Sequence, residues 1–318
     1  MSPSQPARAR RLRMQAMWTA RRAPAKINLA LEVLGRRADG YHQLAAVSQT
    51  IEWGDLVAVD RTSGPAGGPD PASWPVAVTG AMAGGLAGDP GPNLVARAGA
   101  ALAAAGRPPR GARLWLVKRI PVGSGLGGGS ADAAAALRLL APGLSEAELA
   151  RVGARVGADV PFALLGGTAR LGGVGDRVEP LPPPPPGWCV VAVLGAILTR
   201  AVFGCTEDAD HTDGERVGRV AATLAAGGRL DPLWLGSGLE AAAWRAHPGL
   251  EAAARLLRTA TAPAPWALTG SGGAYFSLQP DGAAAAAVAA AARAAVPSAI
   301  VQVTRTSWSP AARPAGSG

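Results

Sequence analysis

Apolar and polar residues alternate along the first part of the chain in a way that predicts strands. Residues 24–34 alternate in part, as a half-buried strand does, and residues 43–60 and 74–79 have the same character. Residues 35–40 predict a turn from their Gly and Asp content, and a Gly/Pro loop at 62–73 separates the second and third strands.

Helical spacing replaces the alternation from residue 93 onward. Asn93 is expected to cap a helix over residues 93–105, because apolar residues recur there at helical spacing. Residues 113–120 predict a strand, and an Ala-rich helix then reaches residue 140. Ser145 is expected to begin a helix that ends near residue 156, with two glutamates in its first turn.

In the second half of the chain, segments with strand-like alternation of apolar residues and segments with helical spacing follow one another. Five prolines at 182–186 predict a rigid connection, and we place a domain boundary near 170–187. Residues 306–318, rich in Ser, Pro and Gly, are expected to form a disordered tail. The elements between them resemble a split βαβ sandwich: strand 188–194, helices 214–226 and 237–257, strands 265–268 and 274–278, helix 282–295 and strand 299–304.

Length and charge narrow the class of protein. A chain of 318 residues fits one large or two medium domains, and no apolar run is long enough to span a bilayer. The formal net charge is +9, but six arginines and no acid lie in residues 1–22. This clustering predicts a disordered arm, or a start at Met14 or Met17, rather than a nucleic-acid-binding surface. Two cysteines without metal spacing favour a reduced, cytoplasmic protein.

Residues 121–137 carry the most informative motif: five glycines within seven positions, then Ser130, then strong helix formers. Glycine lets the backbone approach a ligand closely, and a helix start directs unpaired N–H groups at an anion. No Gly-Lys-Ser/Thr closes the run, so it is not a Walker A loop. No acidic residue follows at the dinucleotide-binding spacing. A flexible linker is the alternative, but a phosphate-binding loop is favoured.

Three further features each allow a structural and a functional interpretation. Lys26 and Asn28 share one face of a strand, where Lys26 is either a solvent-facing edge residue or a paired functional group. Asp159 precedes Val160-Pro161, which favours extended backbone at Val160, and Asp159 is either a turn residue or a positioned carboxylate. The pair at 41–42, Tyr then His, closes a hairpin or contacts a flat ring.

Taken together, five segments resemble the GHMP small-molecule kinases, named for galactokinase and the homoserine, mevalonate and phosphomevalonate kinases. The resemblance covers roughly residues 23–305, and its closest branch phosphorylates a cytidyl diphosphate-linked methylerythritol in the non-mevalonate isoprenoid route. The segments, in chain order, are 24–31, 37–44, 121–137, 157–170 and 268–276.

The resemblance implies an α+β fold of two-layer sandwiches, with a β-α ATP-binding domain at 23–172, a ferredoxin-like domain at 187–305, and the active site in the cleft between them. It implies ATP-dependent phosphorylation of the substrate's 2-hydroxyl. Asp159 would face that hydroxyl, and Lys26 would keep the carboxylate ionised, since a nearby cation lowers a carboxyl pKa. Mg²⁺ is expected with ATP, but no protein ligand for it can be named.

The same resemblance assigns binding residues. Asn93 and Lys118 match positions lining the adenine pocket. Tyr41, His42 and Phe203 match positions that hold the cytosine ring, and Asn28 and Thr199 lie in substrate-side segments. The loop expected to wrap the ATP phosphates comprises Pro121, Val122, Gly123, Ser124, Gly125, Leu126, Gly127, Gly128, Gly129, Ser130 and Ala131.

One segment departs from the family pattern, and alternatives remain. Where the family often has Asn-Asp-Leu-Glu, this chain has Ser-Gly-Leu-Glu at 237–240. Another GHMP kinase, of the homoserine or mevalonate type, is the alternative enzyme. A member that binds nucleotide without catalysis would lack Lys26 or Asp159, and both are present. We expect small-molecule partners, neither nucleic acid nor membrane, and a monomer or weak homodimer.

Overall fold

The computed structural model describes residues 18–60, 67–84, 93–109 and 112–306. The chain divides into two compact units, each made of separate stretches of sequence. The described residues of Met1–Ala23, Asp55–Arg119 and Gly129–Leu164 form unit 1. Those of Pro24–Gly54, Ile120–Gly128 and Leu165–Gly318 form unit 2. The predicted domains at 23–172 and 187–305 stay a prediction.

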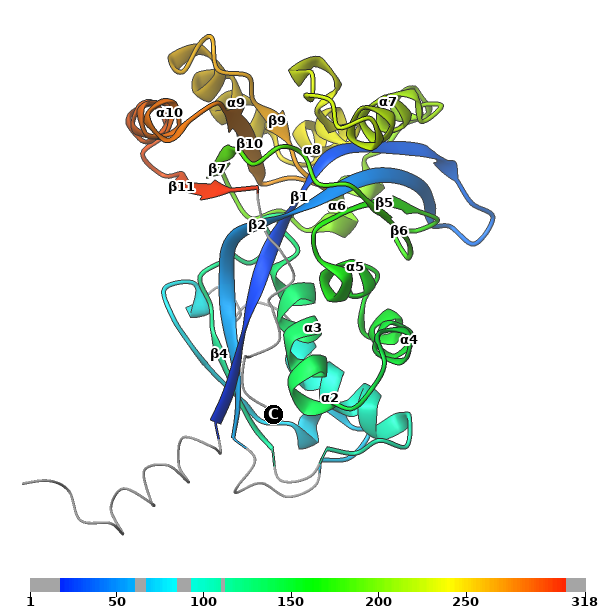
Figure 1. The fold of residues 1–318 in the computed structure, drawn as a ribbon. Coiled ribbons are helices and arrows are strands. Elements are labelled where there is room, and N and C mark those ends of the chain that lie inside the picture. The colour runs from blue at the N-terminus through cyan, green and yellow to red at the C-terminus, as the bar shows by residue number, and fades with distance from the viewer. Residues whose placement is uncertain (1–17, 61–66, 85–92, 110–111, 307–318) are drawn as a thin grey trace, which may run out of the picture. The chain divides into compact units, whose positions relative to one another are not determined.

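The larger sheet has seven strands and draws on both halves of the sequence (Figure 1). Its main order is β3-β4-β2-β1-β8, while β5 pairs antiparallel with β2 and β6 with β5. The strands are β1 (Trp18–Arg36), β2 (His42–Asp60), β3 (Val76–Thr79), β4 (Arg113–Val117), β5 (Thr168–Gly172), β6 (Arg177–Leu181) and β8 (Gly236–Ser237).

Helices and sheet residues bury the core of unit 1. Asn93 Oδ1 accepts from Val95 N at 2.9 Å, which confirms the predicted cap of α2 (Leu94–Ala104). Ser145 and Glu148 form a capping box at the start of α4 (Glu146–Val156), as the Ser-x-x-Glu spacing favours. With the alanine-rich α3 (Gly128–Leu140) and the short α5 (Val160–Leu165), these helices bury their apolar residues with those of β4.

Unit 2 contains a second sheet of four strands in the order β11-β7-β10-β9, with every pair antiparallel. In chain order this is fourth-first-third-second, the order of a split βαβ sandwich. Helix α10 (Gly282–Ala295) packs along β7, β10 and β11 and beside α9 (Pro248–Ala260) (Figure 1). The strands are β7 (Trp188–Val193), β9 (Ala267–Leu268), β10 (Ala274–Gln279) and β11 (Ile300–Arg305).

The remaining helices of unit 2 refine the sequence interpretation. The helix predicted over 237–257 is two helices, because Pro248 cannot donate the bond that would continue the first. Glu32 Oε2 accepts from Val217 N at 2.8 Å and so caps α7 from strand β1. The helices are α6 (Thr199–Gly204), α7 (Glu215–Ala225), α8 (Glu240–Ala246), α9 (Pro248–Ala260) and α10 (Gly282–Ala295). The described residues also form the 3-10 turns η1 (Pro71–Ser73), η3 (Asp208–Asp210) and η4 (Pro232–Trp234).

Several sequence expectations are wrong in detail. Residues 18–22 belong to β1 rather than to a basic tail, whereas residues 1–17 lie outside the described residues. Thr306 is buried and its carbonyl accepts from Gln49 Nε2 at 2.7 Å, so the predicted tail does not begin there, and residues 307–318 are not described. Strand β1 is buried on both faces, not half-buried, from Ala25 to Val33.

Two further differences concern residues 157–181. Val160 begins α5 instead of adopting extended backbone, because Pro161 falls in the first helical turn, where its missing N–H costs nothing. The hairpin of β5 and β6 was not predicted, since its seven exposed or half-buried positions blur the alternation. Within the described ranges, none of the helices combines the length and apolar character that crossing a bilayer requires.

Candidate active site

The glycine run forms a loop with left-handed backbone at alternate positions. Gly123, Gly125 and Gly127 have φ of 71°, 79° and 68°, a region that other residues rarely adopt. Helix α3 begins inside the run, at Gly128, so the last two glycines and Ser130 form its first turn. The side chain of Leu126 is fully buried, and the Ser124 hydroxyl donates to the Pro121 carbonyl at 2.7 Å. These two residues can therefore offer a ligand only backbone groups.

A second glycine-rich segment, residues 270–273, packs against this loop within unit 2. A Cβ at Gly125 would lie 2.9 Å from the Gly272 carbonyl oxygen, and one at Gly273 would lie 2.3 Å from that of Gly195. Both distances are too short for a real side chain, so the backbones touch only because these residues are glycine. The close packing fixes the shape of the loop.

Lys26 lies directly beside the loop in the same unit. Its backbone N–H donates to the Leu126 carbonyl at 2.9 Å, and a Cβ at Gly127 would be 2.9 Å from Lys26 Cγ. Strand β1 carries Lys26 and lies between β2 and β8, so the edge-strand interpretation is wrong. The lysine is 9% exposed.

The Lys26 ammonium contacts Asn28, which is itself held by other polar groups. Nζ donates to Asn28 Oδ1 at 2.6 Å, and Asn28 Nδ2 donates to Ser48 Oγ at 2.8 Å. The Asn28 backbone N–H donates to Thr269 Oγ1 at 2.7 Å. Because Oδ1 accepts from an ammonium and Nδ2 donates to a hydroxyl, both contacts agree on one orientation of the amide. Lys26 and Asn28 therefore share one face, as the alternation predicted.

Asp159 belongs to unit 1 and precedes α5. Its backbone carbonyl accepts from Ala163 N at 3.0 Å, which starts that helix, and the residue is half-buried. Lys26 belongs to unit 2, so the pairing of these two residues remains a proposal.

Unit 1 contains a buried cluster of charges around Lys118. Its ammonium donates to Asp55 and, at 2.9 Å, to Asp132 Oδ2, and all three side chains are at most 3% exposed. Burial alone lowers the pKa of Lys118, but attraction to Asp132 and Asp55 outweighs it, so the pKa is raised. Burial raises the pKa of Asp132 well above its ordinary value despite the attraction of Lys118. Among the described residues, Asp132 Oδ1 has no hydrogen-bond partner.

Asn93, the other residue assigned to the adenine pocket, borders a cavity of about 360 Å³ in unit 1. Trp74, Val76 and Val78 contribute its apolar wall. Cavities of this size, mainly apolar with a few polar groups, suit a flat heterocycle. The Asn93 side chain already caps α2, so its remaining N–H groups are the part that a ligand could use.

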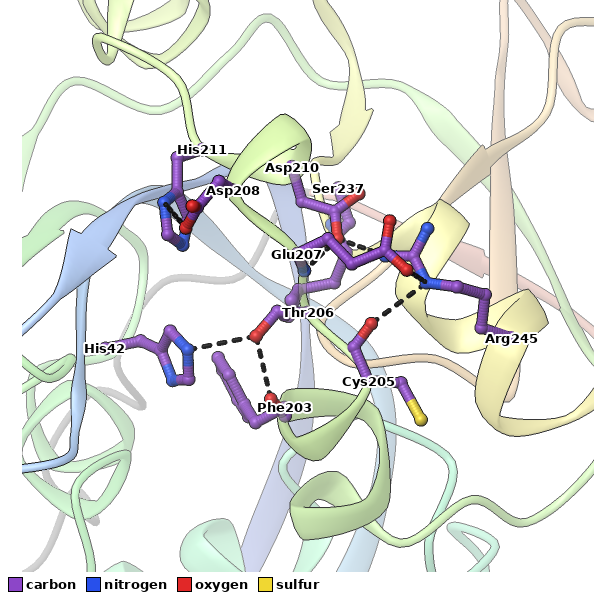
Figure 2. A network of polar contacts seen from close by, with 11 residues as sticks. His42, Phe203, Cys205, Thr206, Glu207, Asp208, Asp210, His211, Ser237 and Arg245 are labelled. Atoms are coloured by element: carbon purple, nitrogen blue, oxygen red, sulfur yellow. Dashed lines mark hydrogen bonds and ion pairs between the residues drawn. The ribbon is translucent and has the colours of Figure 1, made fainter.

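The residues assigned to the cytosine ring meet in part. His42 stacks on Phe203 with 5.1 Å between the ring centroids, and its Nε2 lies 3.0 Å from Thr206 Oγ1 (Figure 2). Tyr41, the residue before β2, is 67% exposed. Thr199, at the start of α6, contacts Ser271 of the second glycine segment at 3.0 Å between hydroxyl oxygens.

Residue Ser237, in the segment that departs from the family pattern, has a structural role. Its hydroxyl donates to the Gly270 carbonyl at 2.7 Å and accepts from Leu239 N at 3.2 Å. Gly238 N donates to the Leu31 carbonyl at 2.7 Å, which holds the segment beside β1. Ser237 thus holds the second glycine segment in place through the Gly270 carbonyl.

Sequence reasoning missed five polar residues at these sites. Each is a single Ser, Thr or Asp whose partner lies far along the chain, so no local pattern marks it. The only available signal is a polar residue within an apolar stretch, which for Ser48, Asp55 and Asp132 indicates a buried hydrogen bond. The five are Ser48, Asp55, Asp132, Thr206 and Ser271.

Comparison with known proteins shows which family this chain resembles. Residues 93–167 match the GHMP kinases N terminal domain. A 4-diphosphocytidyl-2-C-methyl-D-erythritol kinase of Ruegeria pomeroyi is 46% identical over 57% of this chain, and the match spans 61% of that relative. For the same-named protein of Carboxydothermus hydrogenoformans, 42% identical over 53% of this chain, the match spans 56% of the relative. The chain thus spans about three fifths of each.

Longer matches point the same way. The same-named kinase of Xanthomonas campestris pv. campestris is 36% identical over 264 residues, which is 81% of each chain. The chain in a crystal structure of 4-(cytidine 5'-diphospho)-2C-methyl-D-erythritol kinase is 33% identical to this one. The match covers 90% of this chain and 98% of that chain, with a TM-score of 0.71. A homoserine kinase at 18% identity and TM-score 0.64 shows the fold alone. The predicted fold class is confirmed, and the chain belongs to the 4-diphosphocytidyl-2-C-methyl-D-erythritol kinase family of the GHMP kinases.

Proposed function

We propose that this protein transfers the γ-phosphoryl group of ATP to the 2-hydroxyl of 4-diphosphocytidyl-2-C-methyl-D-erythritol. The names of the relatives support the substrate. The observation that carries the proposal is the contact of the glycine loop with Lys26, through the 2.9 Å bond from Lys26 N to Leu126 O and the tight approach at Gly127. These contacts place the Lys26 side chain beside a loop whose backbone conformation suits a phosphate group.

Phosphoryl transfer depends mainly on alignment and on neutralising charge. The left-handed glycines leave room for the phosphates, and backbone N–H groups of the loop and of the first turn of α3 would bind them. Lys26 would stabilise negative charge on the transferred group, while Asn28 holds its ammonium in place. Asp159 would orient the substrate hydroxyl and accept its proton.

The base of ATP would bind in unit 1. Asn93 and the apolar wall of the 360 Å³ cavity fit an adenine ring. Among the described residues the Lys118 ammonium donates to Asp55 and Asp132, and a third N–H could serve a ligand. Mg²⁺ would accompany ATP, held chiefly by phosphate oxygens and water.

The other substrate would bind in unit 2. Tyr41, His42 and Phe203 would hold the cytosine ring, since stacking on aromatic faces suits a flat base. Asn28 and Thr199 would contact the methylerythritol diphosphate. We propose a cytoplasmic enzyme that works as a monomer or weak homodimer, without nucleic acid or membrane.

A phosphoryl-transfer assay tests the assignment. The purified protein is given ATP, Mg²⁺ and one of three acceptors: the cytidyl diphosphate-linked methylerythritol, mevalonate or homoserine. We expect turnover with the first alone. Turnover with mevalonate or homoserine instead would replace the substrate assignment with one of those kinase types.

Two variants then test the roles of the reacting groups. Lys26→Ala and Asp159→Asn are each expected to lower kcat on the order of 10³-fold, because each removes charge stabilisation or proton acceptance in the transition state. ATP binding, measured by titration calorimetry, should persist in both. Near-full turnover in either variant would contradict the mechanism.

A further inference from the structure

The hydroxyl group of Thr206 lies between two groups that compete for its single proton. Thr206 Oγ1 is 2.8 Å from the Phe203 carbonyl oxygen and 3.0 Å from His42 Nε2 (Figure 2). A carbonyl oxygen can only accept, so the hydroxyl proton is directed to Phe203. His42 Nε2 must then donate to the hydroxyl oxygen. The opposite arrangement would leave two oxygen lone pairs facing each other at 2.8 Å.

The main chain around Thr206 is held in place from both sides. Arg245 Nε donates to the Cys205 carbonyl at 2.9 Å, and the guanidinium also pairs with Asp210 (Figure 2). Asp210 Oδ2 in turn accepts from the Glu207 backbone N–H at 2.9 Å. Because both neighbours of Thr206 are anchored, its hydroxyl is a fixed reference for the imidazole and does not simply follow it.

The surroundings of the imidazole favour its neutral form. Burial, and then repulsion by Arg36 and His211, lower the pKa of His42. A neutral ring carries one N–H, and that hydrogen lies on Nε2 when Thr206 accepts. Nδ1 is then an acceptor, and among the described residues no hydrogen bond to it is found.

We propose that Thr206 is a positioning residue that fixes the Nε2–H tautomer of His42 and thereby gives the substrate site a hydrogen-bond acceptor at Nδ1. The tautomer follows from the contacts in the protein alone, while its use in binding rests on the proposed cytidyl substrate. Stacking on Phe203 fixes the plane of the ring, and Thr206 fixes which nitrogen can accept.

The direct test is a long-range ¹H–¹⁵N spectrum of the full-length protein at neutral pH. The chain has three histidines, and the His42 signals are identified by their loss in His42→Gln. We expect a protonated Nε2 and an unprotonated Nδ1 for His42, retained in Thr206→Ser and lost or mixed in Thr206→Val. A wild-type spectrum with the hydrogen on Nδ1, or an unchanged spectrum in Thr206→Val, would overturn the proposal.

Kinetics provide the second readout. Thr206→Val should raise KM for the cytidyl substrate about tenfold, the effect of losing one hydrogen bond of about 1.4 kcal/mol, with KM for ATP and kcat close to wild type. Thr206→Ser should restore the wild-type KM. Equal KM changes in the valine and serine variants would contradict the positioning role. If the wild-type protein does not phosphorylate this substrate, the proposed function fails, while the spectrum still decides the tautomer.

Discussion

Each compact unit buries one lysine, and the contacts of the two differ in kind. In unit 1 the Lys118 ammonium contacts two carboxylates, Asp55 and Asp132. In unit 2 the Lys26 ammonium donates to the neutral amide of Asn28, which Ser48 orients. The carboxylates oppose the charge of Lys118, whereas the Asn28 amide orients the Lys26 ammonium through a hydrogen bond.

This difference suits different tasks. A buried lysine between two carboxylates is costly to desolvate, but once formed the cluster resists rearrangement, because removing one member leaves an uncompensated charge. An amide contributes a hydrogen bond and not an opposite charge, so the Asn28 contact orients the ammonium without itself neutralising it. We therefore expect Lys118 to serve mainly the structure of unit 1, and Lys26 mainly the reaction.

Exchanging each lysine for methionine should separate these roles most sharply. Lys118→Met leaves two buried carboxylates without their cation and should lower the free energy of unfolding by about 4 kcal/mol. Lys26→Met loses the hydrogen bond to Asn28, and its kcat should fall on the order of 10³-fold. Denaturant unfolding and the phosphoryl-transfer assay measure both variants. A kcat near wild type in Lys26→Met, or an unchanged stability in Lys118→Met, would remove the distinction.

Within the charged cluster, Asp55 should matter more than Asp132. Asp55 accepts from the Lys118 ammonium with one oxygen and from the Arg119 backbone N–H with the other. Asp55→Asn turns one of these acceptors into a donor, which sets two donors against each other, and should cost about 3 kcal/mol. Asp55→Asn and Asp132→Asn are compared in one unfolding series. A larger loss in Asp132→Asn would reverse the order.

The sequence was most informative where the signal is local. Asn93 and Ser145 start helices through contacts with residues two or three positions away, and the glycine loop is recognisable from its composition. Val160 shows the limit of a local rule, because the effect of a proline depends on where the helix begins. Thr206 and His42 are 164 residues apart, and Asn28 and Thr269 are 241 apart. Such contacts depend on the fold, so no spacing in the sequence could have predicted them.

The hydrogen bonds that link Lys26 to Asn28 and Asn28 to Ser48 can be weakened at Ser48, without changing either of the other two residues. Ser48→Ala removes the acceptor of Asn28 Nδ2 and lets the amide turn, so kcat should fall about fivefold, equivalent to about 1 kcal/mol. Ser277, also buried in unit 2, accepts from Gln279 Nε2 at 2.8 Å and gives a matched control in Ser277→Ala. Equal kcat values in the two variants would show that Ser48 does not orient the site.

The smallest expected effect is the pH dependence that the charged cluster gives to the free energy of unfolding. Burial raises the pKa of Asp132, so the folded chain binds this proton more tightly than the unfolded chain does. The free energy of unfolding therefore loses a contribution as pH rises from about 4, the unfolded pKa, through the folded pKa. Asp132→Asn removes that loss, so its stability relative to wild type should rise from pH 4 to pH 8.

The net difference between Asp132→Asn and wild type at neutral pH should stay below about 1 kcal/mol, because losing the attraction to Lys118 offsets the removal of a buried charge. Unfolding curves measured at intervals across this pH range give the slope. Glu179→Gln, an exposed carboxyl on β6, is the control and should run parallel to wild type. A relative stability of Asp132→Asn that falls as pH rises would mean that Lys118 stabilises the ionised carboxylate more than burial opposes it. The cluster would then be a net favourable ion pair with a second anion, and Lys118 would be more firmly engaged by its carboxylates.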